Sequence, residues 1–248
     1  QHGPIDLVIG VDRAREAAFD AAEARLNTVL SELMCEISLL RQCDGPAPKG
    51  AIARKMWNAA QAHEGFVTPM AGVAGAVAET VLDAVLSVSD LRRAYVNNGG
   101  DIALYLRSDA TFDVAMAGTD GAALGKITLD VHSKVRGIAT SGQGGRSLSF
   151  GIADSVTVLA ETASAADVAA TLIASAVDLV DHPQIARVPA QTVCDDTDLG
   201  QRRVVVGVGD LSAQDIDHKG RRFAGGKHRN LGAFAHGNQG RWRDRRQT

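Results

Sequence analysis

Asp167 and Thr171 are a carboxylate and a hydroxyl four residues apart, a spacing that could hold a metal ion. On a helix, side chains at this spacing share one face. Carboxylate and hydroxyl oxygens suit a hard cation such as Mg²⁺, which keeps several waters and binds phosphate oxygens as well. The spacing is therefore compatible with a metal site. Spacing alone favours another interpretation, in which Asp167 is the N3 residue of a capping box with Ser164 and Thr171 is incidental.

The segment 140–147 is rich in glycine and hydroxyl groups. Glycine carries no Cβ, so such a loop can bring several backbone N–H groups close to one anion. An arginine adds charge-assisted hydrogen bonds to a phosphate or carboxylate. The ligand-binding candidates are Thr140, Ser141, Gly142, Gly145, Arg146 and Ser147, and the catalytic candidates are Arg146 and Asp154. The alternatives are a surface loop with a solvated arginine, and an aspartate that caps the following strand.

A third candidate is the run Asn-Asn-Gly-Gly-Asp at 97–101. Four of its residues, Asn98, Gly99, Gly100 and Asp101, could contact a heterocycle or a ribose. Asparagine and glycine also tolerate positive φ, so a hairpin turn between two strands accounts for the same residues. Both interpretations stand on the sequence alone.

The elements that must position these residues follow from hydrophobic periodicity and turn residues. They predict an α+β fold with an antiparallel β-sheet core flanked by helices. The predicted elements are a strand at 5–11, helices at 12–41 and 51–62, a helix from 68 to about 85, strands at 95–106 around a turn, strands at 112–117, 126–131 and 155–160, a helix from 164, an irregular segment at 182–199 and a last strand at 203–208.

The predicted helix from 68 has an unusually slim first half, made of glycine and alanine, which lets another backbone or a ligand lie against it. Glu79 and Asp83 are expected on its solvated side. His63 and His182 have no obvious partner in the sequence, so we assign them structural roles.

Composition limits the class of protein. Apolar residues make up 45% and charged residues 22%, which is typical of a globular chain, and aromatic residues only 4%. Three cysteines without metal spacing favour a reducing compartment. The longest uncharged stretch, 65–78, is too short to span a bilayer. We therefore expect a cytoplasmic protein without a membrane partner, although a chain that begins with Gln1 is compatible with a removed leader.

The charge is uneven along the chain. Residues 219–248 contain nine Lys/Arg and one acid, whereas the rest carries an excess of acids. We predict a folded domain at 1–217 and a basic extension at 218–248. The extension could attract nucleic acid, but few of its side chains could stack on bases. A solvated or packing extension is the favoured interpretation, and nucleic acid is not an expected partner.

Several motifs together have a recognisable pattern. They are Thr68-Pro-Met-Ala-Gly-Val-Ala-Gly-Ala-Val-Ala-Glu79, Asn97-Asn-Gly-Gly-Asp-Ile102, Gly137-Ile-Ala-Thr-Ser-Gly142, Gly145-Arg-Ser147, Gly151-Ile-Ala-Asp154, Ala166-Asp-Val-Ala-Ala-Thr171 and Asp198-Leu-Gly200. The chain resembles the ApbE-like proteins from about residue 2 to 211, and more closely the branch of that superfamily whose function is unknown.

The resemblance implies an α+β fold, Mg²⁺, and FAD or FMN. ApbE proteins are magnesium-dependent flavin transferases that cleave FAD and attach FMN to a threonine of a partner protein. By resemblance, their Gly-Gly-Asp turn falls on 99–101 and their Ala-Thr-Ser-Gly loop on 139–142. Their metal-holding Asp-x-x-x-Thr pair falls on Asp167 and Thr171.

The chain also departs from that pattern. The family's His-Ile-Ile-Asp-Pro segment is replaced by 147–154, without the histidine or the proline, and its helix lysine corresponds to Ala74. We therefore expect an enzyme acting on a small molecule, a transferase or hydrolase with Mg²⁺-assisted phosphoryl or nucleotidyl chemistry, that does not flavinylate protein. The alternatives are a non-catalytic flavin or metabolite-binding protein, and a metal-free enzyme on a small cyclic carboxylated substrate. The oligomeric state, including a homo-oligomer, is left open.

Overall fold

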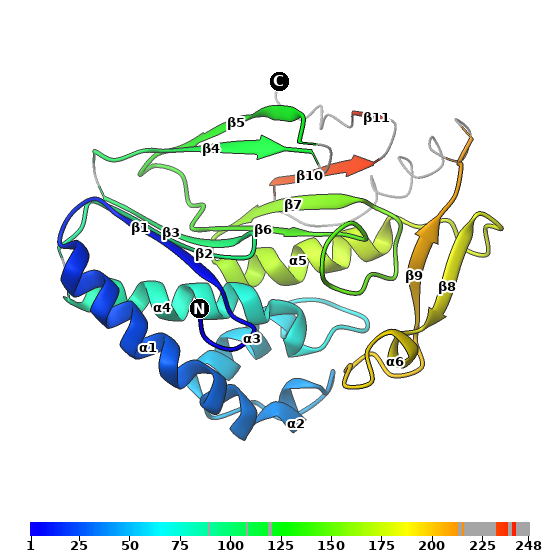
Figure 1. Ribbon diagram of the computed structural model, residues 1–248, viewed down its shortest axis with the longest axis horizontal. Coiled ribbons are helices and arrows are strands. Elements are labelled where there is room, and N and C mark those ends of the chain that lie inside the picture. The colour runs from blue at the N-terminus through cyan, green and yellow to red at the C-terminus, as the bar shows by residue number, and fades with distance from the viewer. Residues whose placement is uncertain are drawn as a thin grey trace. The chain divides into compact units, whose positions relative to one another are not determined.

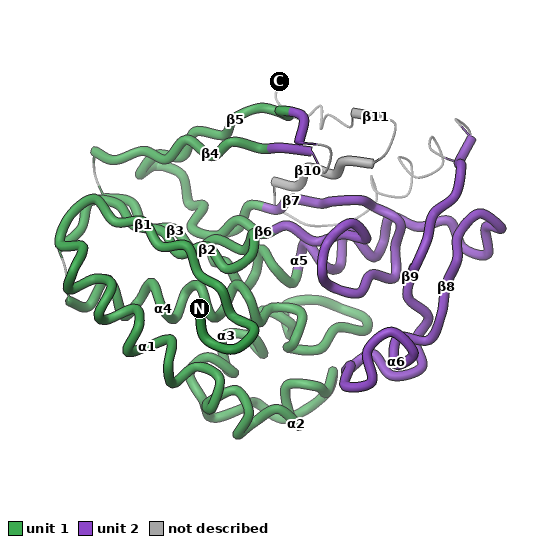
Figure 2. Tube along the Cα trace, viewed as in Figure 1, with its two compact units in different colours: residues 1–116, 123–139, 159–168 green, residues 117–122, 140–158, 169–248 purple. Residues whose placement is uncertain are grey.

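The computed structural model describes residues 1–88, 90–107, 109–118, 121–212 and 215, and the backbone of 232–237 and 240–241 (Figure 1). The chain divides into two compact units (Figure 2). Unit 1 comprises Gln1–Met116, Ala123–Ala139 and Leu159–Val168, and unit 2 comprises Ala117–Ala122, Thr140–Val158 and Ala169–Thr248. The predicted domain 1–217 stays a prediction. The predicted extension 218–248 lies outside the described residues, apart from two short strands.

The sheet of unit 1 has the strand order β1-β2-β3-β6-β7. Its strands are β1 (Leu7–Val11), β2 (Arg93–Asn98), β3 (Asp101–Leu106), the first residues of β6 (Gly137–Ser141) and the last residues of β7 (Ser155–Ala160). The pairs β1–β2, β2–β3 and β3–β6 are antiparallel, as expected.

Helices cover one face of this sheet and a pair of strands covers the other (Figure 1). The helices of unit 1 are α1 (Arg15–Cys35), α2 (Ile37–Leu40), α3 (Ala51–Gln61), the 3-10 helix η1 (Pro69–Gly72), α4 (Val73–Val88) and the first turn of α5 (Ala163–Ala176). Val81, Val85 and Val96 lie in the core between α1, α4 and the sheet. On the opposite face, β4 (Phe112–Ala117) and β5 (Ala123–Leu129) pack over Leu104 and Ile138. This architecture confirms the α+β prediction.

The predicted helix 12–41 is wrong in its continuity, because it is interrupted at Glu36. The two carboxylate oxygens of Glu36 accept the backbone N–H groups of Lys49 at 2.6 Å and Gly50 at 2.7 Å. Those donors lie at the start of α3, where N–H groups have no partner within their own helix. Glu36 therefore leaves helical geometry while capping another helix.

Unit 2 corrects the prediction for 182–199. That segment contains β8 (Ile185–Pro189), paired antiparallel with β9 (Arg203–Val208), and α6 (Ala190–Val193). Ile185 packs with Ile152 and Val205, and this burial stabilises the strand. The arginine and the proline within the strand made it hard to predict from the sequence. The strand 203–208 is not the last one either. In unit 2 the strand order β6-β7 continues with β10 (Gly232–Gly237) and β11 (Gly240–Arg241).

The segment Pro69–Val88, formed by η1 and α4, is long and apolar enough to cross a membrane by length and composition alone, with a mean hydropathy of 1.6. Half of it is buried inside the protein, and the core helix of a soluble protein meets the same criteria. The apolar helical segment therefore extends beyond the uncharged stretch 65–78, because Glu79 and Asp83 do not interrupt the helix.

The slim half of α4 lies directly against the first turn of α5. A Cβ atom added at Gly75 would stand 2.3 Å from the Ala163 carbonyl oxygen, and one at Gly72 would stand 2.9 Å from Val168 Cγ2. Contacts below 3 Å between such atoms are repulsive. Of the two neighbours expected for the slim half of this helix, another backbone or a ligand, the structure shows the backbone of α5.

This crossing predicts that Gly75→Ala destabilises the fold. Alanine favours a helix by about 1 kcal/mol over glycine, but its methyl group meets backbone that can move only with the whole of α5. We expect a net loss of about 1–3 kcal/mol in the free energy of unfolding, measured with urea. Gly207→Ala is the control, because its Cβ would be 3.8 Å from the nearest atom. A stabilised Gly75→Ala protein would contradict the close crossing.

Candidate functional site

The Asn-Asn-Gly-Gly-Asp run forms the turn between β2 and β3, in unit 1. Asn98 pairs with Asp101 across a two-residue loop, and Gly99 and Gly100 have φ of 67° and 115°. Asn97 Oδ1 accepts the Gly100 N–H at 2.8 Å. The hairpin interpretation is confirmed. The turn also directs polar groups inward: Asn98 and Asp101 are both buried, and Asn98 Nδ2 donates to the Ala74 carbonyl at 3.2 Å.

Asp167 is buried against the start of α4. Its Oδ2 atom accepts the Gly75 N–H at 3.0 Å, and the Ala74 N–H also bonds to it. The capping box with Ser164 is wrong: α5 begins at Ala163, and Thr162 Oγ1 accepts the Ala165 N–H at 3.2 Å. The cap of α5 therefore lies two residues earlier than predicted, and Asp167 serves the N-terminal N–H groups of a different helix.

Electrostatics distinguish Asp167 from an ordinary buried carboxyl. Burial raises the pKa of Asp167 well above its usual range, and the nearby charge of Asp101 raises it further, whereas the N–H groups of Gly75 and Ala74 lower it. Two carboxylates close together in a dry site cannot both stay ionised at low cost. Burial and the charge of Asp101 therefore favour a bound proton, or a cation, at Asp167.

Thr171 lies one turn after Asp167 on α5, so the predicted helical spacing is present. In unit 2, Thr171 Oγ1 lies 3.4 Å from Ser141 Oγ, to which it donates. Each hydroxyl retains acceptor capacity. The metal role of Asp167 with Thr171 stays a prediction.

The loop 142–145 is held tightly to the segment before β7, in unit 2. Gln143 and Gly144 donate their N–H groups to the carbonyls of Ala153 at 2.8 Å and Asp154 at 3.0 Å, and Gly145 donates to the Gly142 carbonyl at 3.1 Å. These three N–H groups are therefore engaged, and in this conformation they are not available to an anion. Gly142, with φ of 154°, is required because its Cβ would stand 2.4 Å from the Asp154 oxygen.

The side chains of this loop remain as candidates. Thr140 Oγ1 shares a 2.8 Å hydrogen bond with Thr157 Oγ1. Arg146 and Ser147 are exposed, and the Arg146 guanidinium forms no hydrogen bond or ion pair with any residue that the structure describes. Asp154 is half-buried. The structure thus places 140–147, Asp154 and Thr171 in unit 2, whereas 98–101 and Asp167 lie in unit 1.

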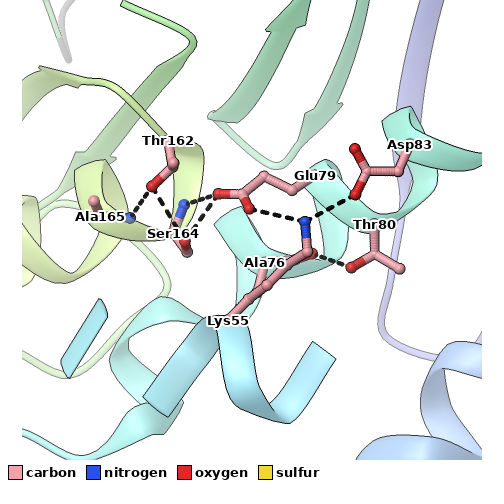
Figure 3. Close-up of polar contacts among 8 residues, drawn as sticks. All are labelled: Lys55, Ala76, Glu79, Thr80, Asp83, Thr162, Ser164 and Ala165. Atoms are coloured by element: carbon pink, nitrogen blue, oxygen red, sulfur yellow. Dashed lines mark hydrogen bonds and ion pairs between the residues drawn. The ribbon is translucent and has the colours of Figure 1, made fainter. Parts of the chain in front are cut away.

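Glu79 is a partly buried acidic residue whose burial was not predicted from the sequence. The side chain expected in solvent is 14% exposed and bonds to Ser164 and Lys55 (Figure 3). Its spacing contained the signal, because Gly72, Gly75 and Glu79 follow the i, i+3, i+7 pattern of one helix face. Asp83 is exposed, as predicted, and pairs with Lys55. No group of three or more His, Cys, Asp or Glu that could hold a metal occurs among the described residues.

The chain has relatives among known proteins. The family model described as "AbpE bacteria" matches residues 1–235. A UPF0280 protein of Methanococcus vannielii is 42% identical over 112 residues, which cover 43% of this chain and 44% of the relative. A UPF0280 protein of Methanobrevibacter smithii is 39% identical over 128 residues, covering 50% and 51%. The chain thus spans about half the length of the curated relatives it matches.

Two solved structures are also similar. The apo flavinyl transferase ApbE of Pseudomonas stutzeri aligns with a TM-score of 0.33 and 15% identity over 69% of this chain and 65% of that chain. The ApbE protein of Thermotoga maritima aligns with a TM-score of 0.38 and 15% identity over 84% and 78%. Similarity at this level assigns no role to any residue here.

The raised pKa of Asp167 predicts the pH dependence of stability. The folded protein holds this proton more tightly than the unfolded chain, so the wild type loses stability as pH rises from the ordinary value of 3.8 through the raised folded value. Asp167→Asn keeps an oxygen for Gly75 and carries no charge. Without divalent cations, we expect this variant to gain stability relative to wild type as the pH rises above the ordinary value of 3.8 through the raised folded value, measured by urea unfolding. Asp83→Asn is the control, and identical pH profiles of wild type and Asp167→Asn would contradict the assignment.

Proposed function

The chain belongs to the family described as "AbpE bacteria", and from that premise we propose that it binds a flavin nucleotide, or a similar anionic aromatic ligand, together with Mg²⁺. In this proposal, the protein is an enzyme that acts on a small molecule and does not transfer FMN to protein. The observation that carries it is the pair of buried carboxylates, Asp101 and Asp167, at the start of α4.

The chemistry of the donors fits Mg²⁺. Carboxylate oxygens are ligands that this ion prefers, and it usually keeps waters and substrate phosphates in its remaining positions. The buried Asp101 and Asp167 would supply carboxylate oxygens of this kind. The Asp167 carboxyl group accepts the N–H groups of Gly75, at its Oδ2 atom, and of Ala74, which orient it. Asp167 and Asp101, both in unit 1, are the proposed holders of the ion. The role of Thr171 in unit 2 stays a prediction from its spacing on α5.

Mg²⁺, when bound, neutralises charge on phosphate oxygens and polarises the phosphoryl group. The residues of the chain orient the carboxylate that would hold the ion and bind the ligand. Gly75 and Ala74 fix the Asp167 carboxylate by their N–H groups. Arg146, exposed and without a described partner, is proposed to hold an anionic group of the ligand. The hydroxyls of Thr140 and Ser141 are proposed as further ligand contacts.

The proposal excludes protein flavinylation because 147–154 lacks the histidine of the flavin transferases that the chain resembles. The segment also has a structural role in this chain. Ser149 is buried, and its hydroxyl forms hydrogen bonds with the Gly151 backbone at 3.2 Å. The carbonyl of Ser149 accepts the Val205 N–H at 2.9 Å. These contacts support a structural role in unit 2.

Thermal unfolding with FAD or FMN, with and without Mg²⁺, tests the proposal. A ligand at about 100 times its Kd adds near 2.7 kcal/mol to the free energy of unfolding. We expect Asp167→Asn to abolish the Mg²⁺-dependent part of that gain and Thr171→Val to reduce it, whereas Asp83→Asn retains it. A wild type that responds to Mg²⁺ neither alone nor with nucleotide would contradict the proposal. In the same mixtures, an acceptor domain carrying the target threonine should stay free of covalent flavin fluorescence.

Arg146→Ala tests the anion contact. We expect FMN binding, measured by calorimetry, to weaken by about 1.5–3 kcal/mol, the range for a hydrogen bond to a charged group. Stability should change by no more than about 0.5 kcal/mol because the side chain is exposed. Arg107→Ala, which removes another exposed arginine, is the control. Equal FMN affinity in the two variants would place the anion contact elsewhere.

A further inference from the structure

The carboxylate of Glu79 joins α4 to the first turn of α5 (Figure 3). Its Oε1 atom accepts the Ser164 backbone N–H at 2.7 Å and the Ser164 hydroxyl at 2.8 Å. Ser164 is itself buried, at 4% exposure. A carboxylate removed from water costs free energy unless it is hydrogen-bonded. These two bonds therefore offset much of the cost of placing Glu79 here.

Lys55, on α3, supplies the opposite charge. Its Nζ atom lies 3.2 Å from Glu79 Oε2 and 2.8 Å from Asp83 Oδ2. Burial lowers the pKa of Lys55, but the hydrogen bonds and charges of Asp83 and Glu79 outweigh burial, and the pKa is raised. The Lys55 ammonium thus meets the Oε2 atom of Glu79, whereas the Oε1 atom accepts both Ser164 donors.

The bond from Ser164 to Glu79 is the counterpart of the bond from Gly75 to Asp167. Gly75 and Glu79 are four residues apart on α4, and Ser164 and Asp167 are three apart on α5. Each helix therefore contributes one N–H donor and one carboxylate, and the two bonds run in opposite directions. Residues of one helical turn move together, because they are spaced by only ~1.5 Å along the axis and joined by backbone bonds. Holding Ser164 therefore also holds Asp167.

Side-chain packing alone does not set this register. Gly72 does face the Cγ2 atom of Val168, but the atoms nearest to Gly75 are backbone atoms of Ala163 and Ser164. At Gly75 there is therefore no ridge of side chains that would interlock with a groove of the other helix. Apolar contacts between such small groups are non-directional. Charge-assisted hydrogen bonds have defined lengths and directions, and they fix the register where side-chain ridges are absent.

We propose that Glu79 is the positioning residue of the carboxylate site: by holding Ser164 it sets the place of Asp167 against Gly75, and thereby the affinity of the site for a divalent cation. The cation part of this inference rests on the proposed function. The effect on Asp167 is measurable with no cation present, because the Gly75 N–H reports it directly.

The test compares wild type, Glu79→Ala and Glu79→Gln by amide hydrogen exchange of Gly75 without metal and by titration with Mn²⁺. In Glu79→Ala we expect Gly75 to exchange about tenfold faster and Mn²⁺ to bind about tenfold more weakly, the factor that corresponds to 1.4 kcal/mol. The side-chain amide oxygen that Glu79→Gln introduces can still accept hydrogen bonds from Ser164. This variant should therefore keep most of the wild-type protection of Gly75 and most of the wild-type affinity for Mn²⁺. If Glu79→Ala does not fold, Ser164→Ala removes only the hydroxyl bond and should give a smaller change in the same direction.

Val85→Ala is the matched control, because Val85 is buried in the core on the same helix but is not part of the Glu79–Ser164 contact. Gly75 exchange in Glu79→Ala no faster than in Val85→Ala, compared at equal free energy of unfolding, would overturn the inference, since Glu79 would then contribute stability only. Faster Gly75 exchange with unchanged Mn²⁺ affinity would overturn its cation part. A wild type that binds no Mn²⁺ contradicts the proposed function instead, and Gly75 exchange then still decides whether Glu79 positions Asp167.

Discussion

The crossing of α4 and α5 is the contact on which the candidate carboxylate site depends. At Gly75 the two backbones approach so closely that no side chain fits between them. This closeness brings the free N–H groups at the start of each helix within reach of a carboxylate on the other. Asp167 accepts an N–H group at the start of α4, and Glu79 accepts one at the start of α5. Helix N-termini favour negative charge, so the crossing stabilises two acidic side chains in a place that otherwise disfavours them.

The two carboxylates differ in how their charge is balanced. Glu79 has the ammonium of Lys55 beside it. The neighbour that acts on Asp167 is the acidic Asp101, which adds to the effect of burial on its pKa. The same crossing therefore holds one balanced acid and one acid that still lacks a positive partner among the described contacts. This asymmetry, and not the number of acids, distinguishes a structural carboxylate from a candidate cation ligand.

The loop of unit 2 follows a different physical rule. Gly142 allows the chain to lie against the segment before β7, and the N–H groups of Gln143 and Gly144 are hydrogen-bonded to that segment. A glycine-rich loop is thus compatible with anion binding without providing it. The exposed side chains of Arg146 and Ser147 are accessible to a ligand, whereas the backbone N–H groups of Gln143 and Gly144 are already hydrogen-bonded.

Local signals in the sequence were sufficient for most elements. The β-branched run at 155–160, Thr68-Pro69 before a slim helix and the Asn-Gly turn at 97–100 each depend on nearby residues, and the structure agrees with them. The motifs also identified the family that the family model matches. Propensity and turn geometry act over a few residues, so a single sequence contains that information.

Only the tertiary structure decided which partner each polar side chain meets. Glu36 interrupts a periodic helix to cap α3, and Ile185 lies in a strand because Val205 and Ile152 bury it. Asp167 accepts a hydrogen bond from Gly75, 92 residues away in the chain, and not from its own helix. Glu79 accepts one from Ser164, 85 residues away, and does not extend into solvent. Local spacing permits several partners for each of these groups. The choice is made when packing brings distant backbone N–H groups to a buried carboxylate that must be satisfied.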